Sequence, residues 1–224
     1  MKTPVNSRTL KNHFTYSWWK YLLVLAAGIF LVNLIFTVTT PRIPEDKKVE
    51  FYIYGLADDN ALSAYLENVR VTEMPDMEAV THSVLFQDQT YGAMTLVTHI
   101  AAHEGDIYLM PRDEFLSYAA AGAFAPLEEE EALMSFFSEA GVDLTRGWRT
   151  LSEEGERHLY GIPADVLPGL STLCYAENGY LAVLAFNGND ENSLKFLRIL
   201  CRDTITAPEP AETASPEEAP QQGS

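Results

Sequence analysis

Cysteine is scarce in this chain of 224 residues, which contains only Cys174 and Cys201. Neither lies near the end of the apolar segment close to the N-terminus, so a lipid-modified cysteine there cannot attach the chain to a membrane. Both lie in the part that we place outside the cell below, where a disulfide can form and would stabilise the domain by about 3 kcal/mol. Positions near a strand and at a helix end also suit two buried thiols, so both alternatives stay open.

Positive charge is scarce beyond Lys20, where eleven Lys and Arg face 32 Asp and Glu, a formal charge of −21. A surface this acidic repels phosphate backbones and anionic lipid headgroups, so we predict no nucleic-acid partner. The acidity alone selects no ligand. It is typical of a solubilising surface on an exported protein.

The common catalytic motifs are absent: the sequence has no G-x-S-x-G, no P-loop, no H-E-x-x-H and no G-x-G-x-x-G. We therefore predict that the chain is not an enzyme and takes no cofactor. His99 and His103 share a helix face, with His82 as the nearest further ligand, but the solvated side of an amphipathic helix explains their spacing without a metal. The acidic run 128–131 favours a helix start over a calcium loop. We predict no metal site.

One long apolar run is present, at residues 21–40, and it contains no charged residue. Its length matches the roughly 20 residues that a helix needs to cross a bilayer. The segment before it is basic, with Lys2, Arg8, Lys11 and Lys20. This asymmetry predicts a single-pass cell-membrane protein with its N-terminus in the cytoplasm and its C-terminal part outside. A cleaved signal peptide is the alternative, although residues 36–40 offer only a poor cleavage site.

Composition divides the remainder into two parts. Residues 207–224 contain no aromatic or large aliphatic residue and are rich in Pro, Glu and Ala, so we predict a disordered acidic tail. Residues 41–206 have the length of one ordinary domain with a single core. The predicted order is a cytoplasmic segment (1–20), a transmembrane helix (21–40), an extracellular domain (41–206) and the tail.

Within residues 41–206, the hydrophobic period switches between two and 3.6 residues, which indicates alternating strands and helices. The predicted strands are 49–54, about 84–86, 106–110, 159–163 and 181–186. The predicted helices are one capped by Asp58 or Asp59, 92–103, one from a cap at Asp113 to Gly122, 128–140, and 191–201 capped by Asn189 or Asp190. The first six elements alternate, so we predict an α/β fold with a mostly parallel sheet flanked by helices.

Three segments carry a family resemblance. The first runs from Gly105 to Leu127 and ends in the pattern G-x-F-x-P-L, the second is Tyr160-Gly161-Ile162-Pro163, and the third is 179–200, where Asn189 opens a helix. Together they resemble the extracellular solute-binding proteins of bacterial ABC importers, in the sugar-binding branch with the type II periplasmic-binding fold. The resemblance implies one periplasmic-binding-protein-like lobe, a small-molecule solute such as a sugar, and an ABC transporter permease or other membrane protein as partner.

The departures from that family bear on function. A complete member has two lobes that close on a ligand, which requires about twice this domain. Only 15 residues separate Pro163 from Gly179, where the family places its second lobe. A single lobe offers a shallow, wet site and weak binding. A second copy could supply the missing lobe at a homodimer interface, although acidity opposes that arrangement.

A surviving ligand surface is expected at the carboxyl ends of the parallel strands, where loops converge in open α/β sheets. The candidate ligand-binding residues at that edge are Asp58, Arg112, Asp113 and Tyr160. Each also has a structural explanation: the two aspartates as helix caps, the arginine as a partner for nearby acids, and the tyrosine as half-buried packing. No sugar-contact motif is repeated at these positions.

Two functional hypotheses follow. The first is a membrane-anchored accessory protein of the solute-binding type, associated with ABC-type carbohydrate transport and binding solute weakly or not at all. The second is a non-catalytic scaffold or interaction module of the cell envelope that has lost ligand binding.

Overall fold

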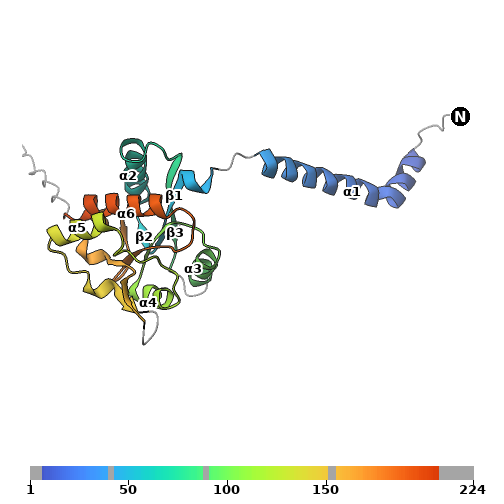
Figure 1. The fold of residues 1–224 in the computed structure, drawn as a ribbon. Helices are drawn as coiled ribbons and strands as arrows, with labels where there is room; N and C mark the ends of the chain where they lie inside the picture. The colour runs from blue at the N-terminus through green and yellow to red at the C-terminus, as the bar shows by residue number, and fades with distance from the viewer. Residues whose placement is uncertain (1–6, 40–42, 88–90, 151–154, 207–224) are drawn as a thin grey trace, which may run out of the picture. The chain divides into compact units, whose positions relative to one another are not determined.

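The computed structural model describes residues 7–39, 43–87, 91–150 and 155–206, and it separates the chain into a unit up to residue 42 and a unit from residue 43 (Figure 1). The predicted tail at 207–224 lies outside the described residues. The first unit is a single helix, α1 (Ser7–Thr39). Its Trp18–Thr37 stretch is long and apolar enough to cross a membrane, and a signal sequence has the same length and composition.

A five-stranded sheet forms the centre of the second unit, in the order β3-β1-β4-β9-β7. Its strands are β1 (Lys48–Tyr54), β3 (Ala79–Leu85), β4 (Ile107–Met110), β7 (Ile162–Pro163) and β9 (Tyr180–Val183). β1 pairs in parallel with both β3 and β4. β9 pairs antiparallel with β4 and with β7, so the sheet is mixed where we predicted it to be mostly parallel. The reason is that the chain enters β9 beside Met110, at the carboxyl end of β4.

Helices cover both faces of this sheet, as predicted. Along β1, Val49, Phe51 and Ile53 point into one buried cluster, and Tyr52 and Tyr54 point into another. The first cluster also holds apolar side chains of α2 (Asp59–Thr72), α5 (Glu131–Glu139) and α6 (Asp190–Thr204). The second holds side chains of α3 (Tyr91–Ala101) and α4 (Arg112–Ala120). Alternation along the strands therefore gives the sheet two apolar faces, each buried by helices.

Short elements complete the domain. Two small antiparallel ladders pair β2 (Leu56–Ala57) with β8 (Cys174–Tyr175) and β5 (Trp148–Thr150) with β6 (Arg157–Leu159). The 3-10 turns are η1 (Glu45–Lys47), η2 (Thr145–Gly147), η3 (Ala164–Val166) and η4 (Pro168–Thr172). The β2–β8 ladder joins the loop after β1 to the segment before β9, which brings these distant segments to the same edge of the sheet.

The predicted helix starts have different outcomes. Asp58 caps α2, because its Oδ1 accepts hydrogen bonds from the backbone N–H groups of Asn60 and Ala61. The cap at Asp113 is wrong: the extended residue Pro111 is the N-cap of α4, which begins at once with Arg112.

The acidic run at 128–131 also starts its helix later than predicted. α5 begins only at Glu131, because the Glu128 carboxylate is used elsewhere. It accepts a hydrogen bond from the backbone N–H of Leu159 and contacts the His158 ring. Glu128, which we predicted in the first turn of the helix, therefore joins the turn before α5 to β6.

Candidate functional site

The site lies where the connections of the sheet diverge. β1 leads through α2 to β3 on one side, whereas β4 leads through α4 toward β7 and β9 on the other. In open α/β sheets such a switch point leaves a crevice outside the carboxyl ends of the two strands, because their following loops turn away from each other. Here those ends are Tyr54 of β1 and Met110 of β4, the latter followed by Pro111.

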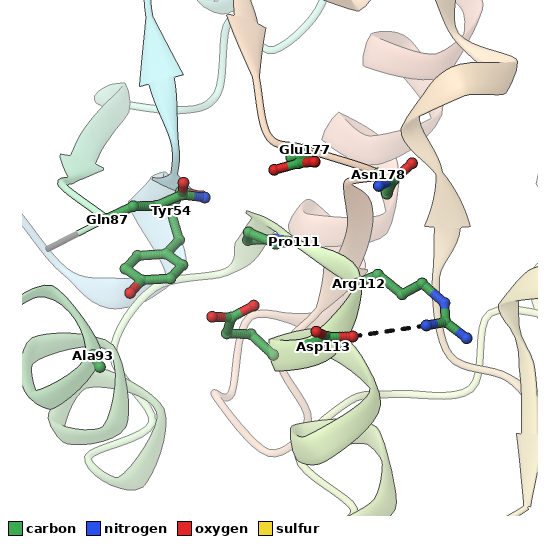
Figure 2. Close-up of a pocket in the computed structure, with 9 residues that line it drawn as sticks. Tyr54, Gln87, Ala93, Pro111, Arg112, Asp113, Glu177 and Asn178 are labelled. Carbon is green, nitrogen blue, oxygen red and sulfur yellow. Dashed lines mark hydrogen bonds and ion pairs between the residues drawn. The ribbon is translucent and has the colours of Figure 1, made fainter. Parts of the chain in front are cut away.

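A cavity of about 820 Å³ opens at that switch point (Figure 2). This volume falls within the range of roughly 300–1,000 Å³ that is usual for small-molecule sites. Its described lining residues are Tyr54, Gln87, Ala93, Pro111, Arg112, Asp113, Glu114, Glu177 and Asn178. They come from the ends of β1, β3 and β4, from the first turns of α3 and α4, and from the turn between β8 and β9.

Close backbone approach fixes the β1 and α3 side of the cavity. A Cβ atom on Gly92 would lie 1.8 Å from the carbonyl oxygen of Phe86 and 3.2 Å from the Tyr54 ring. Only glycine therefore lets the first turn of α3 pack so closely against the segment after β3. Gln87 also joins the segment after β3 to the end of β1, since its Nε2 donates a hydrogen bond to the carbonyl oxygen of Tyr54 at 3.1 Å.

A tight turn forms the opposite side. The backbone N–H of Gly179 donates to the carbonyl oxygen of Ala176, which closes a β-turn with Glu177 and Asn178 at its corners. Asn178 adopts a left-handed backbone with φ of 47°, a conformation that Asn tolerates better than most residues. The turn places both corner residues on the cavity, across from Asp113 in Figure 2.

The charges of the cavity are unbalanced. Arg112 Nη1 lies 3.7 Å from Asp113 Oδ1, so this pair is close to neutral. Among the described residues, the side chains of Glu114 and Glu177 form no ion pair or hydrogen bond with one another or with a neighbour. Burial raises the pKa of nearby Tyr118, and the negative charge of Glu114 raises it further. Within the described residues, the carboxylates of Glu114 and Glu177 therefore have no cationic partner in the cavity.

The structure brings together two of the four predicted ligand residues. Arg112 and Asp113 line the cavity, whereas Asp58 and Tyr160 are absent from its described lining. Tyr160 is buried at 4% exposure among the aromatic residues of the α4 side, deeper than the half-buried packing that we predicted. Arg112 does pair with a nearby acid, as predicted.

Sequence reasoning missed Tyr54, Gln87, Ala93, Glu114, Glu177 and Asn178. Two signals could have found some of them. Gln87 and Tyr54 stand at the ends of predicted strands, the same criterion that selected Asp58. Asn178-Gly179 is a turn dipeptide directly before a strand, and it marks the turn that reaches the cavity.

A second cavity of about 360 Å³ adjoins the first, and Asn178 lines both. Leu167, Leu170 and Leu109 give it a more apolar wall, and Cys174 also contacts it. Cys174 and Cys201 are both buried free thiols in the structure. Burial raises the pKa of Cys174 to about 12, so its thiolate form is scarce at neutral pH.

The histidines considered as metal ligands have separate partners. His99 Nδ1 lies 2.5 Å from Glu104 Oε2, His103 Nδ1 lies 3.2 Å from the carbonyl oxygen of Ala185, and His82 Nε2 lies 3.0 Å from Asp59 Oδ1. Across the part of the chain that the structure describes, no group of three or more His, Cys, Asp or Glu side chains is placed to hold a metal ion.

Similarity to known proteins is found among solved structures. No family model and no curated protein matches the chain. Among solved structures, the chain is similar to an extracellular solute-binding protein family 1 from Alicyclobacillus acidocaldarius, with 20% sequence identity and a TM-score of 0.36. The alignment covers 52% of this chain and 27% of that protein, so the chain spans about a quarter of its length.

Proposed function

We propose that this chain is a membrane-anchored, extracellular accessory protein of the solute-binding type, associated with ABC-type transport of a small solute such as a carbohydrate. It binds that solute weakly, performs no catalysis, and contacts a transporter permease or another membrane protein. The observation that carries the proposal is the cavity of about 820 Å³ at the carboxyl ends of β1 and β4. Open α/β sheets bind small ligands at this place.

The lining supports binding of a polar solute. Gln87 and Asn178 supply amide groups, the edge of the buried Tyr54 ring supplies an apolar contact, and carboxylates accept hydrogen bonds. Such a mixture of a few convergent polar groups beside an aromatic ring is typical of small-molecule sites. The cavity has only one domain behind it, so a bound solute stays partly in water and we expect millimolar rather than micromolar affinity.

The apolar part of α1 supports the anchor. A helix of this length and composition can span a bilayer, and the basic residues before it favour a cytoplasmic N-terminus. Intact-mass spectrometry of the protein from the membrane fraction tests whether the N-terminal segment is retained. An intact chain retaining residues 1–20 supports the anchor, whereas a chain that begins after residue 36 would identify a cleaved signal sequence.

The solute-binding proposal is tested by filling the cavity. Ala93 is exposed on the first turn of α3 and lines the cavity, whereas Ala101 is exposed at the end of the same helix and is not among its lining residues. We would compare Ala93→Trp with Ala101→Trp in the full chain held in phosphatidylcholine nanodiscs. Both add the same side chain to the same helix, so only loss of binding in Ala93→Trp locates a solute in the cavity.

The screen uses glucose, maltose, amino acids and short peptides at millimolar concentration, with thermal shift and ligand-observed NMR as readouts. A ligand near its dissociation constant adds only about 0.4 kcal/mol of stability, so ligand-observed NMR is the more sensitive of the two readouts. We expect binding in the unmodified chain and in Ala101→Trp, and at least a tenfold weaker affinity in Ala93→Trp. If no ligand binds, or if every ligand that binds does so equally well to Ala93→Trp, the proposal is wrong.

One observation favours the alternative of a non-catalytic interaction module. The outward side of α3 and the residue after β3 expose large apolar side chains, with Phe86, Tyr91, Met94 and Val97 each more than half exposed. Neighbouring apolar residues of this kind often mark protein contacts. If Met94→Glu displaced the chain from a membrane complex and Ala93→Trp did not, the interaction module would be the better description.

A further inference from the structure

We propose that the solute of the large cavity is an organic cation that carries an apolar part, such as an arylalkyl amine, rather than a neutral sugar or an anion. This inference rests on the proposed solute-binding function and names the ligand class for that same cavity. It is carried by three features: the uncompensated carboxylates of the cavity, the exposed ring of Tyr175, and the adjoining apolar cavity.

The carboxylates converge from two separate elements. Glu114 stands on the first turn of α4 and Glu177 stands on the turn before β9, and both line the cavity. The only cation in the described lining, Arg112, already faces Asp113. Two like charges without a counter-ion repel an anionic ligand and attract a cationic one, and the surrounding low-dielectric walls strengthen both effects.

The exposed aromatic surface that suits an organic cation comes from Tyr175, because Tyr54 is buried at 4% exposure. The Tyr54 ring lies between α3 and α4 in Figure 2 beside Gly92, whereas Tyr175 is 54% exposed and lines the second cavity. An ammonium group is attracted to the face of an aromatic ring, and the attraction grows as water is excluded. The Tyr175 ring also gives the apolar part of the ligand a packing surface, which a metal ion would not use.

Apolar surface continues beyond this ring. Leu56 pairs with Tyr175 across the β2–β8 ladder and is 65% exposed. The second cavity, with Leu109, Leu167 and Leu170, is reached past Asn178. A ligand with its charged group near Glu177 can therefore extend its apolar part along this wall. A fully hydroxylated sugar would leave that surface unused.

The test compares three probes of similar size and different charge: benzylammonium, benzyl alcohol and benzoate. Glucose and maltose form the sugar arm. The full chain is held in zwitterionic phosphatidylcholine nanodiscs, and empty nanodiscs provide the blank. Dissociation constants come from ligand-observed NMR titrations at pH 7. The diagnostic variant is Glu114→Gln with Glu177→Gln, which removes both charges and keeps the side-chain size.

The matched control is Glu78→Gln with Glu139→Gln. Both control residues are exposed and neither lines the cavity, so the control changes the net charge by the same amount. We expect benzylammonium to bind at least tenfold tighter than benzyl alcohol and benzoate not to bind. This preference should disappear in the cavity variant and persist in the control. It should also weaken as NaCl rises from 0.05 to 0.5 M, because the Debye length falls to about 4 Å and exposed charges are then strongly screened.

The outcomes separate this inference from the function on which it rests. A sugar that binds and is displaced by Ala93→Trp, with benzylammonium no better than benzyl alcohol, overturns the cation and keeps the solute site. Equal benzylammonium binding in the cavity and control variants also overturns the cation, because general acidity then explains it. If no probe responds to Ala93→Trp, both the cation and the solute-binding function are wrong.

Discussion

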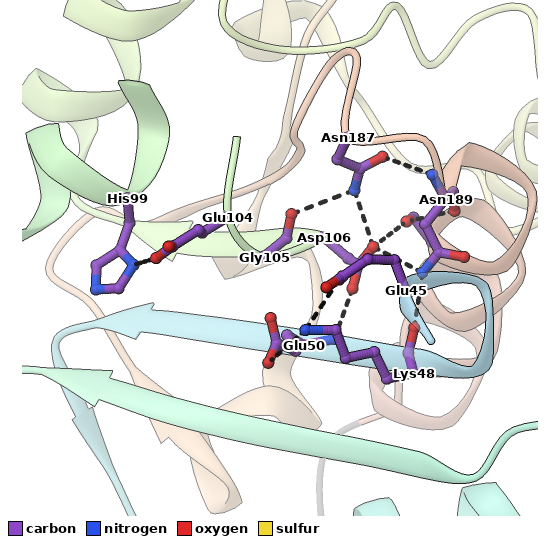
Figure 3. A network of polar contacts seen from close by, with 10 residues as sticks. Glu45, Lys48, Glu50, His99, Glu104, Gly105, Asp106, Asn187 and Asn189 are labelled. Atoms are coloured by element: carbon purple, nitrogen blue, oxygen red, sulfur yellow. Dashed lines mark hydrogen bonds and ion pairs between the residues drawn. The ribbon is translucent and has the colours of Figure 1, made fainter. Parts of the chain in front are cut away.

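The two ends of the central sheet differ in how their polar groups are satisfied. At the amino end, the carboxylate of Asp106 is buried and accepts hydrogen bonds from Glu50 N–H, Asn187, Asn189 and Ser193 (Figure 3). At the carboxyl end, Glu114 and Glu177 face an open cavity, and within the described residues neither has a partner. One end is closed by internal hydrogen bonds, and the other presents polar groups that a ligand could satisfy.

The closed end ties three elements together. Asp106 Oδ2 accepts from the backbone N–H of Glu50 at 2.7 Å, while its Oδ1 accepts from Asn187 and Asn189 at 2.8 Å and from Ser193 at 3.0 Å. These bonds join β1, the start of β4, and the start of α6. Burial raises the pKa of Asp106, and the donors from Glu50, Asn189 and Ser193 oppose that rise. Internal hydrogen bonds therefore stabilise the amino end of the sheet, whereas the carboxyl end holds the polar groups that are open to a ligand.

The largest expected effect comes from breaking the closed end with Asp106→Ala. This change leaves the Glu50 N–H and several side-chain donors without their acceptor in a buried site, which we expect to cost about 3 kcal/mol. For a domain of this size, that lowers the Tm by roughly 6–12 °C. Thermal unfolding of the full chain in nanodiscs measures it. The exposed Asp76→Ala is the control, and a shift no larger than the control's would show that the network contributes little.

Gly92→Ala should disturb the open end. The added Cβ would overlap the Phe86 carbonyl at 1.8 Å, so the first turn of α3 must move away from Phe86. We expect a cost of about 2 kcal/mol from this overpacking, together with weaker solute binding. Asp106→Ala, by contrast, should lower the Tm and leave the affinity of the folded protein unchanged. Unaltered binding in Gly92→Ala would mean that this contact does not shape the cavity.

The same contrast between the two ends explains what could be predicted from the sequence. Alternating side chains along residues 49–54 and the stripes of the helices predicted both faces of the sheet, because burial imposes those periods locally. The direction of β9 depends on where its chain enters, which no local pattern encodes. Arg112 and Asp113 were found because they directly follow a strand, whereas Glu177 reaches the cavity only through the β2–β8 pairing.

Buried polar networks escaped prediction for a related reason. Asn189 is the N-cap of α6 as predicted, but its side chain donates to Asp106 and to the carbonyl oxygen of Lys48 instead of capping the helix. Asp106 lies 83 residues away along the chain. Residue type alone gives Asn a capping preference, and only the fold decides which of two partners it takes.

The two cysteines differ in how close they lie to a cavity. Cys174 lines the cavity of about 360 Å³ near the open end, whereas Cys201 is fully buried on α6. If the open end unfolds locally more easily, iodoacetamide at pH 8 should label Cys174 about tenfold faster, equivalent to about 1.4 kcal/mol in opening free energy. Peptide mass spectrometry identifies the site. Equal rates would show that both thiols are exposed by the same opening.

The thiol count in denaturant, without reductant, decides between the two alternatives left open by the sequence. Two reactive thiols per chain agree with the separate thiols of the structure. None would reveal a bridge between Cys174 and Cys201, and the domain would then need to rearrange around it.

The smallest expected effect concerns Asp58, where two substitutions distinguish a helix cap from a ligand-binding residue. Because its side chain caps α2 and is not among the residues that line the cavity, Asp58→Ala should cost about 1 kcal/mol, or roughly 2–4 °C in Tm. Asp58→Asn preserves the cap and should change the Tm little. Solute affinity should be the same in both variants. A tenfold loss of affinity in both, with only Asp58→Ala less stable, would assign the carboxylate to the ligand after all, since Asn replaces the capping oxygen and not the charge.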